Sequence, residues 1–175
     1  MKIFLVRHGE VDHNLYKMYS NVDEDLNETG IKQAEELKDE IEKIEYDIVI
    51  SSPMLRAKHT AEIINCKSKK IIIDERLEER DPGSLSGQSI EITDREEYWN
   101  YYSKIKYGTS ESMNILFERV RDFLDNLKTK EYKSVLIVAH SGISKAFYAY
   151  FNGIPEDGKF LKLGLNNCEI KEYEL

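Results

Sequence analysis

The sequence has no long hydrophobic run. The longest apolar stretch near its N-terminus is IFLV at residues 3–6. A membrane-spanning helix needs about 20 apolar residues, and the core of a signal peptide needs about 7 to 15. We therefore expect no transmembrane or targeting segment, no membrane partner and a cytoplasmic protein.

Cysteine, proline and glycine are also scarce. The two cysteines, Cys66 and Cys168, form no CxxC pair and have no neighbouring His or Cys ligands of the kind that bind zinc. We expect both to be reduced side chains without a metal. With 3 Pro and 9 Gly in 175 residues, no linker rich in Pro, Gly or Ser interrupts the chain. This length and a hydrophobic content of 41% predict a single domain over residues 1–175.

Basic residues are fewer than acidic ones, with 25 Lys and Arg against 33 Asp and Glu, so the formal net charge is −8. Nucleic acids and anionic membrane surfaces bind proteins through a positive field, so we expect neither as a partner. A small anionic substrate is compatible with this charge, because a local cluster of Arg and His binds phosphate at short range, where screening is weak. The sequence indicates no oligomeric state.

Four short apolar runs alternate with helical patterns. Such runs, apolar at successive positions, are typical of strands that are buried on both faces. The alternation predicts an α/β fold, namely a three-layer α/β/α sandwich with a mostly parallel sheet and helices on both faces. A further segment, CEIKEYE at 168–174, alternates apolar and polar residues as an edge strand does. The four runs are KIFLV (2–6), DIVI (47–50), KIIID (70–74) and SVLIVA (134–139).

Helices are expected over 27–44, over 52–64, over 112–128 and after His140. Asn27 and Ser112 are predicted N-caps, since their side-chain oxygens can accept hydrogen bonds from backbone N–H groups of the first turn. Ser52 is also predicted as an N-cap, with Pro53 at the first helical position, where its missing N–H costs nothing.

The segment 88–110 is predicted to be a short helical insert. Within it, Tyr98, Tyr101 or Tyr102, and Ile105 fall at helical spacing, which indicates an amphipathic helix. This helix either packs on the domain as a cap or forms a lid whose aromatic side chains contact the organic part of a substrate. The sequence favours the cap, and the lid is the alternative interpretation.

Reactive side chains follow each of the four predicted strands. In open α/β sheets, ligands bind outside the carboxyl ends of the strands, so these residues should meet at one edge of the sheet. The alternative is that each strand ends in a solvated turn and each residue only caps or packs. The convergence of a complete set of groups favours a site. The residues are Arg7 and His8, then Ser51, Ser52 and Arg56, then Glu78 and Glu79, then His140.

These residue types suit phosphoryl transfer. The guanidinium groups of Arg7 and Arg56 match the oxygens of a transferring phosphoryl group bidentately. One neutral histidine can attack phosphorus, while a second, protonated, donates to an oxygen. A carboxylic acid such as Glu79 can give a proton to the leaving alkoxide. We expect this chemistry to need no metal and no cofactor.

The same residues lie in ordered blocks that resemble the histidine phosphatase superfamily, also called the phosphoglycerate mutase-like family. The match covers nearly the whole chain. The aromatic insert, together with YSNVDEDLNETG at 19–30, is weakly similar to α-ribazole phosphatases. The blocks are RHGE (7–10) followed by Asn14, SSPMLRAKHTA (51–61), RLEERDPGSLSG (76–87), ES (111–112) and VAHSGIS (138–144).

The resemblance implies a phosphohistidine intermediate on His8. It also implies a phosphate pocket formed by Arg7, Arg56 and His140, with His140 acting in catalysis. Asn14 matches a further phosphate contact of the family.

The resemblance places the family's acid at Glu79, with Glu78 as the neighbour to consider. Two positions depart from the family pattern. The family commonly has Thr or Ser where this chain has Val11, and Gly where it has Ser141, a residue that we expect to bind substrate. Both departures bear on the choice of substrate.

We predict a metal-independent hydrolase of a small phosphorylated metabolite, with α-ribazole phosphate, sugar phosphates and phosphoglycerates as candidates. Phosphoglycerate mutase activity is the alternative. The family's mutases carry a longer insertion after the acid and an extra C-terminal tail, whereas only residues 88–110 separate Gly87 from Glu111 here. A phosphatase must admit water, so hydrolysis is favoured. A non-catalytic phosphate-binding module would lack His8 or the acid, and both are present.

Overall fold

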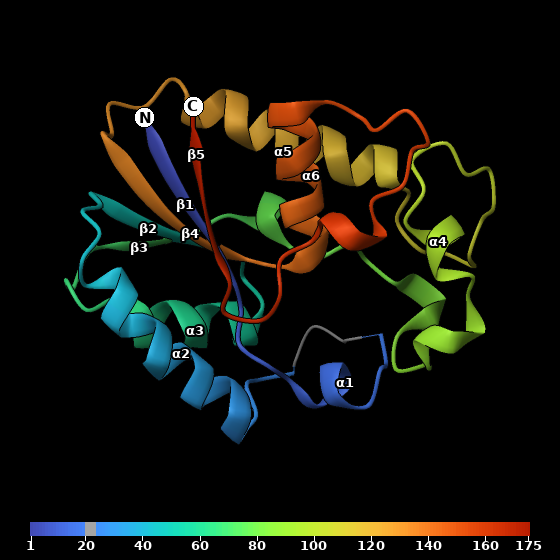
Figure 1. The fold of residues 1–175 in the computed structure, drawn as a ribbon, viewed down its shortest axis with the longest axis horizontal. Helices are drawn as coiled ribbons and strands as arrows, with labels where there is room; N and C mark the ends of the chain where they lie inside the picture. Colours follow the sequence, from blue (N-terminus) through green and yellow to red (C-terminus); the bar gives the residue numbers. More distant parts are fainter. Residues whose placement is uncertain (20–23) are drawn as a thin grey trace.

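A five-stranded sheet forms the centre of the molecule (Figure 1), with the strand order β3-β2-β4-β1-β5. The computed structural model describes residues 1–19 and 24–175. Residues 20–23, part of the segment similar to α-ribazole phosphatases, lie outside the described residues. β1, β2, β3 and β4 run parallel, and β5 joins β1 as the antiparallel edge strand that the sequence predicts. The strands are β1 Lys2–Arg7, β2 Ile48–Ser51, β3 Ile71–Ile73, β4 Ser134–Ala139 and β5 Ile170–Glu174.

Helices cover both faces of this sheet, which confirms the predicted three-layer α/β/α fold (Figure 1). The apolar side chains of β1 alternate between the layers, because successive residues of a strand point to opposite faces. Phe4 and Val6 pack against α2 and α3, whereas Ile3 and Leu5 pack against α5 and α6. In the described residues, no helix is long and apolar enough to cross a membrane. The α-helices are α1 Asp12–Leu15, α2 Glu28–Ile41, α3 Leu55–Ile64, α4 Arg95–Tyr98, α5 Met113–Leu127 and α6 Ser141–Asn152.

The register of the parallel strands aligns their carboxyl ends. Arg7 pairs with Ala139, and Ser51 pairs with Val138. The His8 backbone N–H continues the ladder by donating to the Ala139 carbonyl at 3.0 Å. The first residues after β1, β2 and β4 therefore lie at the same edge of the sheet.

Two of the three predicted N-caps are confirmed. Asn27 accepts a hydrogen bond from the Gly30 N–H at 2.8 Å, and Ser112 accepts one from the Ile115 N–H at 3.3 Å.

The prediction for Ser52 and Pro53 is wrong, because α3 begins at Leu55 and Met54 is its N-cap residue. The Ser52 hydroxyl instead lies 2.7 Å from His140 Nε2, while it accepts the Met54 N–H at 3.3 Å. The side chain that would cap the helix therefore contacts a residue of the predicted site.

The insert is less helical than its spacing predicts, since α4 ends at Tyr98. The backbone that would continue the helix pairs instead with residues 158–160. The Tyr101 N–H donates to the Gly158 carbonyl at 2.8 Å, and the Phe160 N–H donates to the Trp99 carbonyl at 2.9 Å. As a result, Ile105 is 56% exposed, whereas Tyr98 and Trp99 are buried.

Candidate active site

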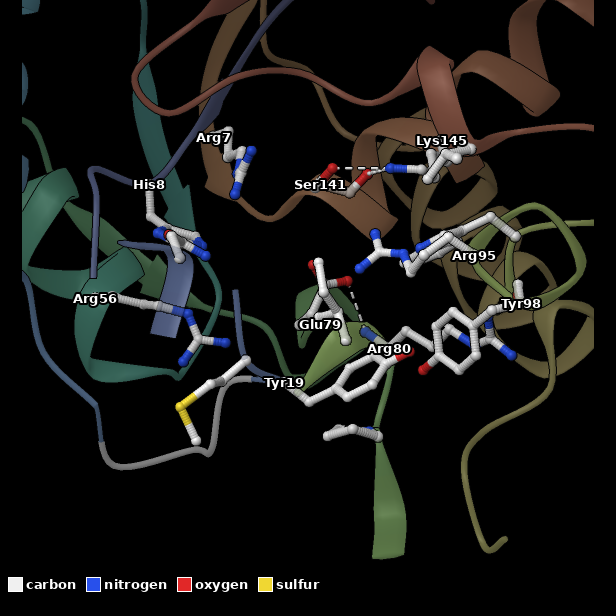
Figure 2. Close-up of a pocket in the computed structure, with 16 residues that line it drawn as sticks. Arg7, His8, Tyr19, Arg56, Glu79, Arg80, Arg95, Tyr98, Ser141 and Lys145 are labelled. Atoms are coloured by element: carbon white, nitrogen blue, oxygen red, sulfur yellow. Dashed lines mark hydrogen bonds between the residues drawn. The ribbon is translucent and has the colours of Figure 1, made fainter. Parts of the chain in front are cut away.

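A cavity of about 220 Å³ opens at the carboxyl edge of the sheet (Figure 2). Of the two candidate acids, Glu79 lines this cavity and Glu78 is exposed to solvent. His140 is buried and is not among the described residues that line the cavity, but its ring centroid lies 5.0 Å from that of His8. The structure therefore brings all the predicted site residues to one place. Those that line the cavity are Arg7, His8, Asn14, Arg56, Glu79 and Ser141.

His8 lies directly after β1 with its ring almost completely buried. Its Nδ1 lies 2.7 Å from the Gly9 carbonyl oxygen. A carbonyl can only accept, so Nδ1 carries the proton and Nε2 keeps its lone pair. Burial, followed by the charges of Arg56 and Arg7, holds the pKa of His8 well below its usual range. The ring is therefore neutral at pH 7, with Nε2 available as a nucleophile.

The turn after His8 depends on glycine. A Cβ on Gly9 would collide with the backbone of Gly30, which lies in the first turn of α2. The Gly9 N–H donates to the Thr60 hydroxyl at 3.1 Å, which ties the turn to α3 as well. The nucleophile is thus carried by a segment that is packed against two helices.

His140 follows β4 and is 1% exposed. Its Nε2 contacts the Ser52 hydroxyl, and its Nδ1 has no hydrogen-bond partner among the described residues. Burial, and then the charge of Arg56, lowers the pKa of His140 well below its usual range. The second histidine is therefore neutral at pH 7 in this pocket, whereas the sequence interpretation had it protonated.

Arg7 and Arg56 supply two guanidinium groups to the same side of the cavity as His8 (Figure 2). Arg7 Nη1 donates to the Leu165 carbonyl at 2.9 Å, which fixes the direction of the group. Arg56, in the first turn of α3, is 1% exposed. Burial lowers the pKa of both guanidinium groups. Cations removed from water in this way favour an anion between them.

Glu79 lies across the cavity from these groups (Figure 2). One carboxylate oxygen accepts the Arg80 N–H at 2.7 Å, and the other accepts the Gly142 N–H at 3.0 Å. A Cβ on Gly142 would collide with the Glu79 carboxylate. Glycine at this position lets the first turn of α6 hold the carboxylate in the cavity.

Asn14 and Ser141 complete the predicted set. The Asn14 side-chain oxygen accepts a hydrogen bond from the Asn167 amide at 3.2 Å, so its NH₂ group is the part left to donate. Val11 is fully buried as the N-cap residue of α1 and is not among the described residues that line the cavity.

Three cationic residues that the sequence did not single out also line the cavity, namely Arg80, Arg95 and Lys145. Arg80 lies next to the acid in a charged run that resembles a solvated surface. Lys145 lies four residues after Ser141 on α6, so both side chains fall on one face of the helix. That spacing is the signal that could have identified Lys145.

The aromatic insert contributes to the wall, since Tyr98 and Trp99 line the cavity. This position agrees with the lid hypothesis for those two residues. Tyr101 and Tyr102 are not among the lining residues of the described chain. In the same described part, no group of three or more His, Cys, Asp or Glu side chains could hold a metal ion.

Comparisons with known proteins give matches over nearly the whole chain. A family model described as histidine phosphatase superfamily (branch 1) matches residues 3–175. The metal-independent phosphoserine phosphatase of Arabidopsis thaliana is 31% identical, over 99% of this chain and 78% of that protein.

Solved structures are similar over nearly the whole chain. A mutant of the phosphoserine phosphatase from Entamoeba histolytica, in complex with phosphoserine, is 28% identical with a TM-score of 0.80, over 98% of this chain and 89% of that one. The α-ribazole phosphatase from Shigella flexneri has a TM-score of 0.84 at 24% identity, over 100% and 91% of the two chains. At 24% identity, the similarity to the α-ribazole phosphatase shows only that the two chains share a fold.

Proposed function

Because the chain belongs to the histidine phosphatase superfamily, we propose that it hydrolyses a small phosphomonoester through a phosphohistidine on His8, without a metal or other cofactor. The observation that carries this proposal is the state of His8. Its ring is neutral, its Nδ1–H is fixed on the Gly9 carbonyl, and two guanidinium groups share its side of the cavity.

In the first step, His8 Nε2 attacks phosphorus, so a P–N bond forms while the P–O bond to the leaving group breaks. Arg7 and Arg56 stabilise the charge on the phosphoryl oxygens. Glu79, in its acid form, gives its proton to the leaving alkoxide.

In the second step, water attacks the phosphohistidine. The Glu79 carboxylate takes a proton from this water as its oxygen bonds to phosphorus and the P–N bond breaks. Inorganic phosphate leaves, and neutral His8 and protonated Glu79 are restored.

His140 can act in this scheme although it is neutral. If the Ser52 hydroxyl donates to Nε2, then Nδ1 carries the proton and can donate to a phosphoryl oxygen. A bound phosphoryl dianion also favours the charged form of a neighbouring imidazole, which opposes the effect of burial on the pKa of His140.

Hydrolysis is favoured over a mutase reaction by the short insert, whose helix is a single turn; the relatives include proteins named as phosphatases and as probable phosphoglycerate mutases. A panel of α-ribazole phosphate, phosphoserine and 3-phosphoglycerate, each with and without 2,3-bisphosphoglycerate, separates the two activities. We expect release of inorganic phosphate in the presence of EDTA. Isomerisation without phosphate release would establish the mutase alternative.

The decisive variant is His8→Ala. We expect turnover of p-nitrophenyl phosphate to fall by about 10³-fold or more, because the nucleophile is lost. The wild type should form an alkali-stable phosphoenzyme on rapid mixing with substrate, and the variant should form none. Glu78→Gln is a control, because this exposed side chain lies outside the cavity lining. An unchanged rate in a folded His8→Ala protein, or loss of wild-type activity in EDTA, would refute the proposal.

A further inference from the structure

Ser141 and Lys145 form a close pair that the proposed phosphatase chemistry does not use. They lie four residues apart on α6, so the two side chains fall on one face of the helix. Lys145 Nζ lies 2.8 Å from the Ser141 hydroxyl oxygen, and both residues line the cavity (Figure 2). Ser141 is also a position where the chain departs from the glycine that is common in the family. A hydroxyl group therefore reaches the cavity with an amine at hydrogen-bond distance.

Lys145 is buried without a carboxylate partner. It is 3% exposed, and no described carboxylate forms an ion pair with it. Burial lowers the pKa of Lys145 to about 7. An ordinary lysine, with a pKa of about 10.4, is almost fully charged at neutral pH, whereas a large share of this amine is unprotonated. The charged groups that act on it are Glu79, which opposes the shift, and Arg7, Arg95 and Arg80, which add to it.

The contacts of the amine suit its neutral form. A neutral amine has a lone pair that can accept the Ser141 O–H, and it can still donate to the Ser141 carbonyl oxygen at 3.4 Å. Within the described part of the chain, the Ser141 hydroxyl has no other hydrogen-bond partner. A Cβ on Gly164 would collide with both Lys145 Nζ and the Ser141 hydroxyl, so this glycine lets the backbone enclose the pair. The hydroxyl proton is therefore directed to the amine.

Unpaired donors line the same cavity. Trp99 is 7% exposed, and its Nε1–H has no hydrogen-bond partner among the described residues. The Nε of Arg95 is buried without one in that part of the chain as well. Buried polar groups are normally satisfied, so these donors indicate an absent acceptor. The oxyanion that forms when a hydroxyl attacks a carbonyl is an acceptor of this kind.

We propose that Ser141 and Lys145 form a second catalytic pair that hydrolyses small carboxylic esters, with Ser141 Oγ as the nucleophile and Lys145 Nζ as its base. A serine activated by a neutral lysine is an established arrangement for acyl transfer on other folds. The activity uses neither His8 nor Glu79, so it is independent of the proposed phosphatase function.

In the acylation step, Ser141 Oγ attacks the ester carbonyl carbon while its proton passes to Lys145 Nζ. The new C–O bond gives a tetrahedral oxyanion, which the donors of Trp99 and Arg95 stabilise. The bond to the leaving alkoxide then breaks, the Lys145 ammonium gives it the proton, and an acyl-serine remains.

In the deacylation step, Lys145 Nζ takes a proton from water as the water oxygen bonds to the acyl carbon. The bond between this carbon and Ser141 Oγ breaks, and the ammonium returns the proton to the serine. The net reaction consumes one ester and one water and gives an acid and an alcohol.

p-Nitrophenyl acetate is the probe for this activity. We expect the wild type to release nitrophenolate faster than buffer does and to carry an acetyl group on Ser141 that neutral hydroxylamine removes. Ser141→Ala should lower kcat/KM for the acetate by about 10²-fold or more, because the nucleophile is lost. Ser86→Ala is the matched control, since this serine is exposed and outside the cavity lining.

Two substitutions of Lys145 separate a base from a structural lysine. Lys145→Met removes a buried charge, and Lys145→Arg keeps a cation that can donate to Ser141 but cannot accept its proton. We expect both to lower kcat/KM for the acetate by about 10²-fold or more, with circular dichroism showing that both are folded. Lys162→Met is the control, because this lysine is exposed and outside the cavity lining.

The pH dependence gives a further readout. The base acts in its neutral form, so kcat/KM of the wild type for the acetate should rise with pH to a plateau, with a midpoint near 7. The pKa values of His8 and His140 are held well below their usual range, which places their titration at lower pH. The rise should be absent in both Lys145 variants.

The site of acetylation decides the proposal. The hydroxylamine-sensitive label on Ser141 should also form in His8→Ala, so a failure of the phosphohistidine mechanism leaves this test intact. An acetyl group on His8, or one on Lys145 that resists hydroxylamine, would overturn the serine as nucleophile. A wild-type rate equal to that of buffer, or full activity in Ser141→Ala or Lys145→Arg, would overturn the catalytic pair.

Discussion

Glu79 shows how much a single side chain depends on its backbone neighbours. Its carboxylate accepts the N–H of the next residue and the N–H of Gly142 in the first turn of α6. Glu78, the adjacent residue with the same chemistry, points to solvent. The role of proton donor in the proposed mechanism therefore follows from position and not from residue type.

Glu79→Gln should slow hydrolysis of substrates with poor leaving groups far more than of those with good ones. The amide cannot give a proton, and an alkoxide needs one more than a nitrophenolate does. The measurement is a comparison of kcat/KM for an alkyl phosphate and for p-nitrophenyl phosphate. We expect a loss of about 10²-fold or more for the alkyl ester. Equal slowing of both substrates, or a larger effect from Glu78→Gln, would assign the acid elsewhere.

At the scale of elements, the loop that carries Glu79 is held by α5. Arg119 on this helix donates to the carbonyl of Arg76 at 2.7 Å and to that of Glu79 at 3.1 Å. Its guanidinium also pairs with both carboxylate oxygens of Glu111, at 2.8 and 2.9 Å. Glu111 in turn accepts the Asp81 N–H at 3.2 Å. This pair fixes the loop on both sides of the acid.

Arg119→Met should therefore act on catalysis through the position of Glu79. We expect kcat for alkyl phosphates to fall by about 10- to 100-fold with a small change in KM, since small displacements of a catalytic group have effects of that size. The dependence on the leaving group should shift toward that of Glu79→Gln. Arg121→Met, an exposed change two residues along α5, is the control. A loss that is the same for good and poor leaving groups would indicate general destabilisation.

The sequence predicts best the helices and strands whose conformation is determined by their own residues. β4 was predicted at its observed bounds because SVLIVA is apolar at every position after Ser134 and all six residues are buried. The helix expected within residues 88–110 ends at Tyr98, because the backbone of Trp99 and Tyr101 pairs with residues 158–160, a contact of long range in sequence. Lys145 was missed for a similar reason. Its burial depends on Trp99 and Gly164, which only the folded chain brings beside it.

At the scale of the whole molecule, the cavity concentrates buried bases. His8, His140 and Lys145 all have a pKa below the ordinary value of their type, with burial as the largest cause. In the unfolded chain these groups bind protons more readily than in the folded one. Stability must therefore rise with pH over the ranges in which only the unfolded state is protonated.

For the histidines, this range lies below about pH 6.5, the ordinary pKa of the imidazole. The contribution of the neutral histidines to the free energy of unfolding is fully present above that pH and is lost as the pH falls toward their lowered pKa. We expect the free energy of unfolding in urea to decrease from pH 6.5 to 5, by at most about 1.4 kcal/mol per pH unit for each proton taken up. His140→Gln should reduce this slope. An unchanged slope would mean that His140 is protonated in the folded protein.

The residues that line the cavity come from two different parts of the fold. The groups around the phosphate follow β1, β2 and β4, where the register of the sheet fixes them. Arg95, Trp99 and Lys145, which also line the cavity, come from α4, from its C-cap and from the second turn of α6. This separation has an evolutionary consequence. Substitutions in the insert can change which metabolite is accepted while the reacting groups stay in place. Enzymes that descend from one ancestor can therefore diverge in substrate specificity and keep the same catalytic mechanism.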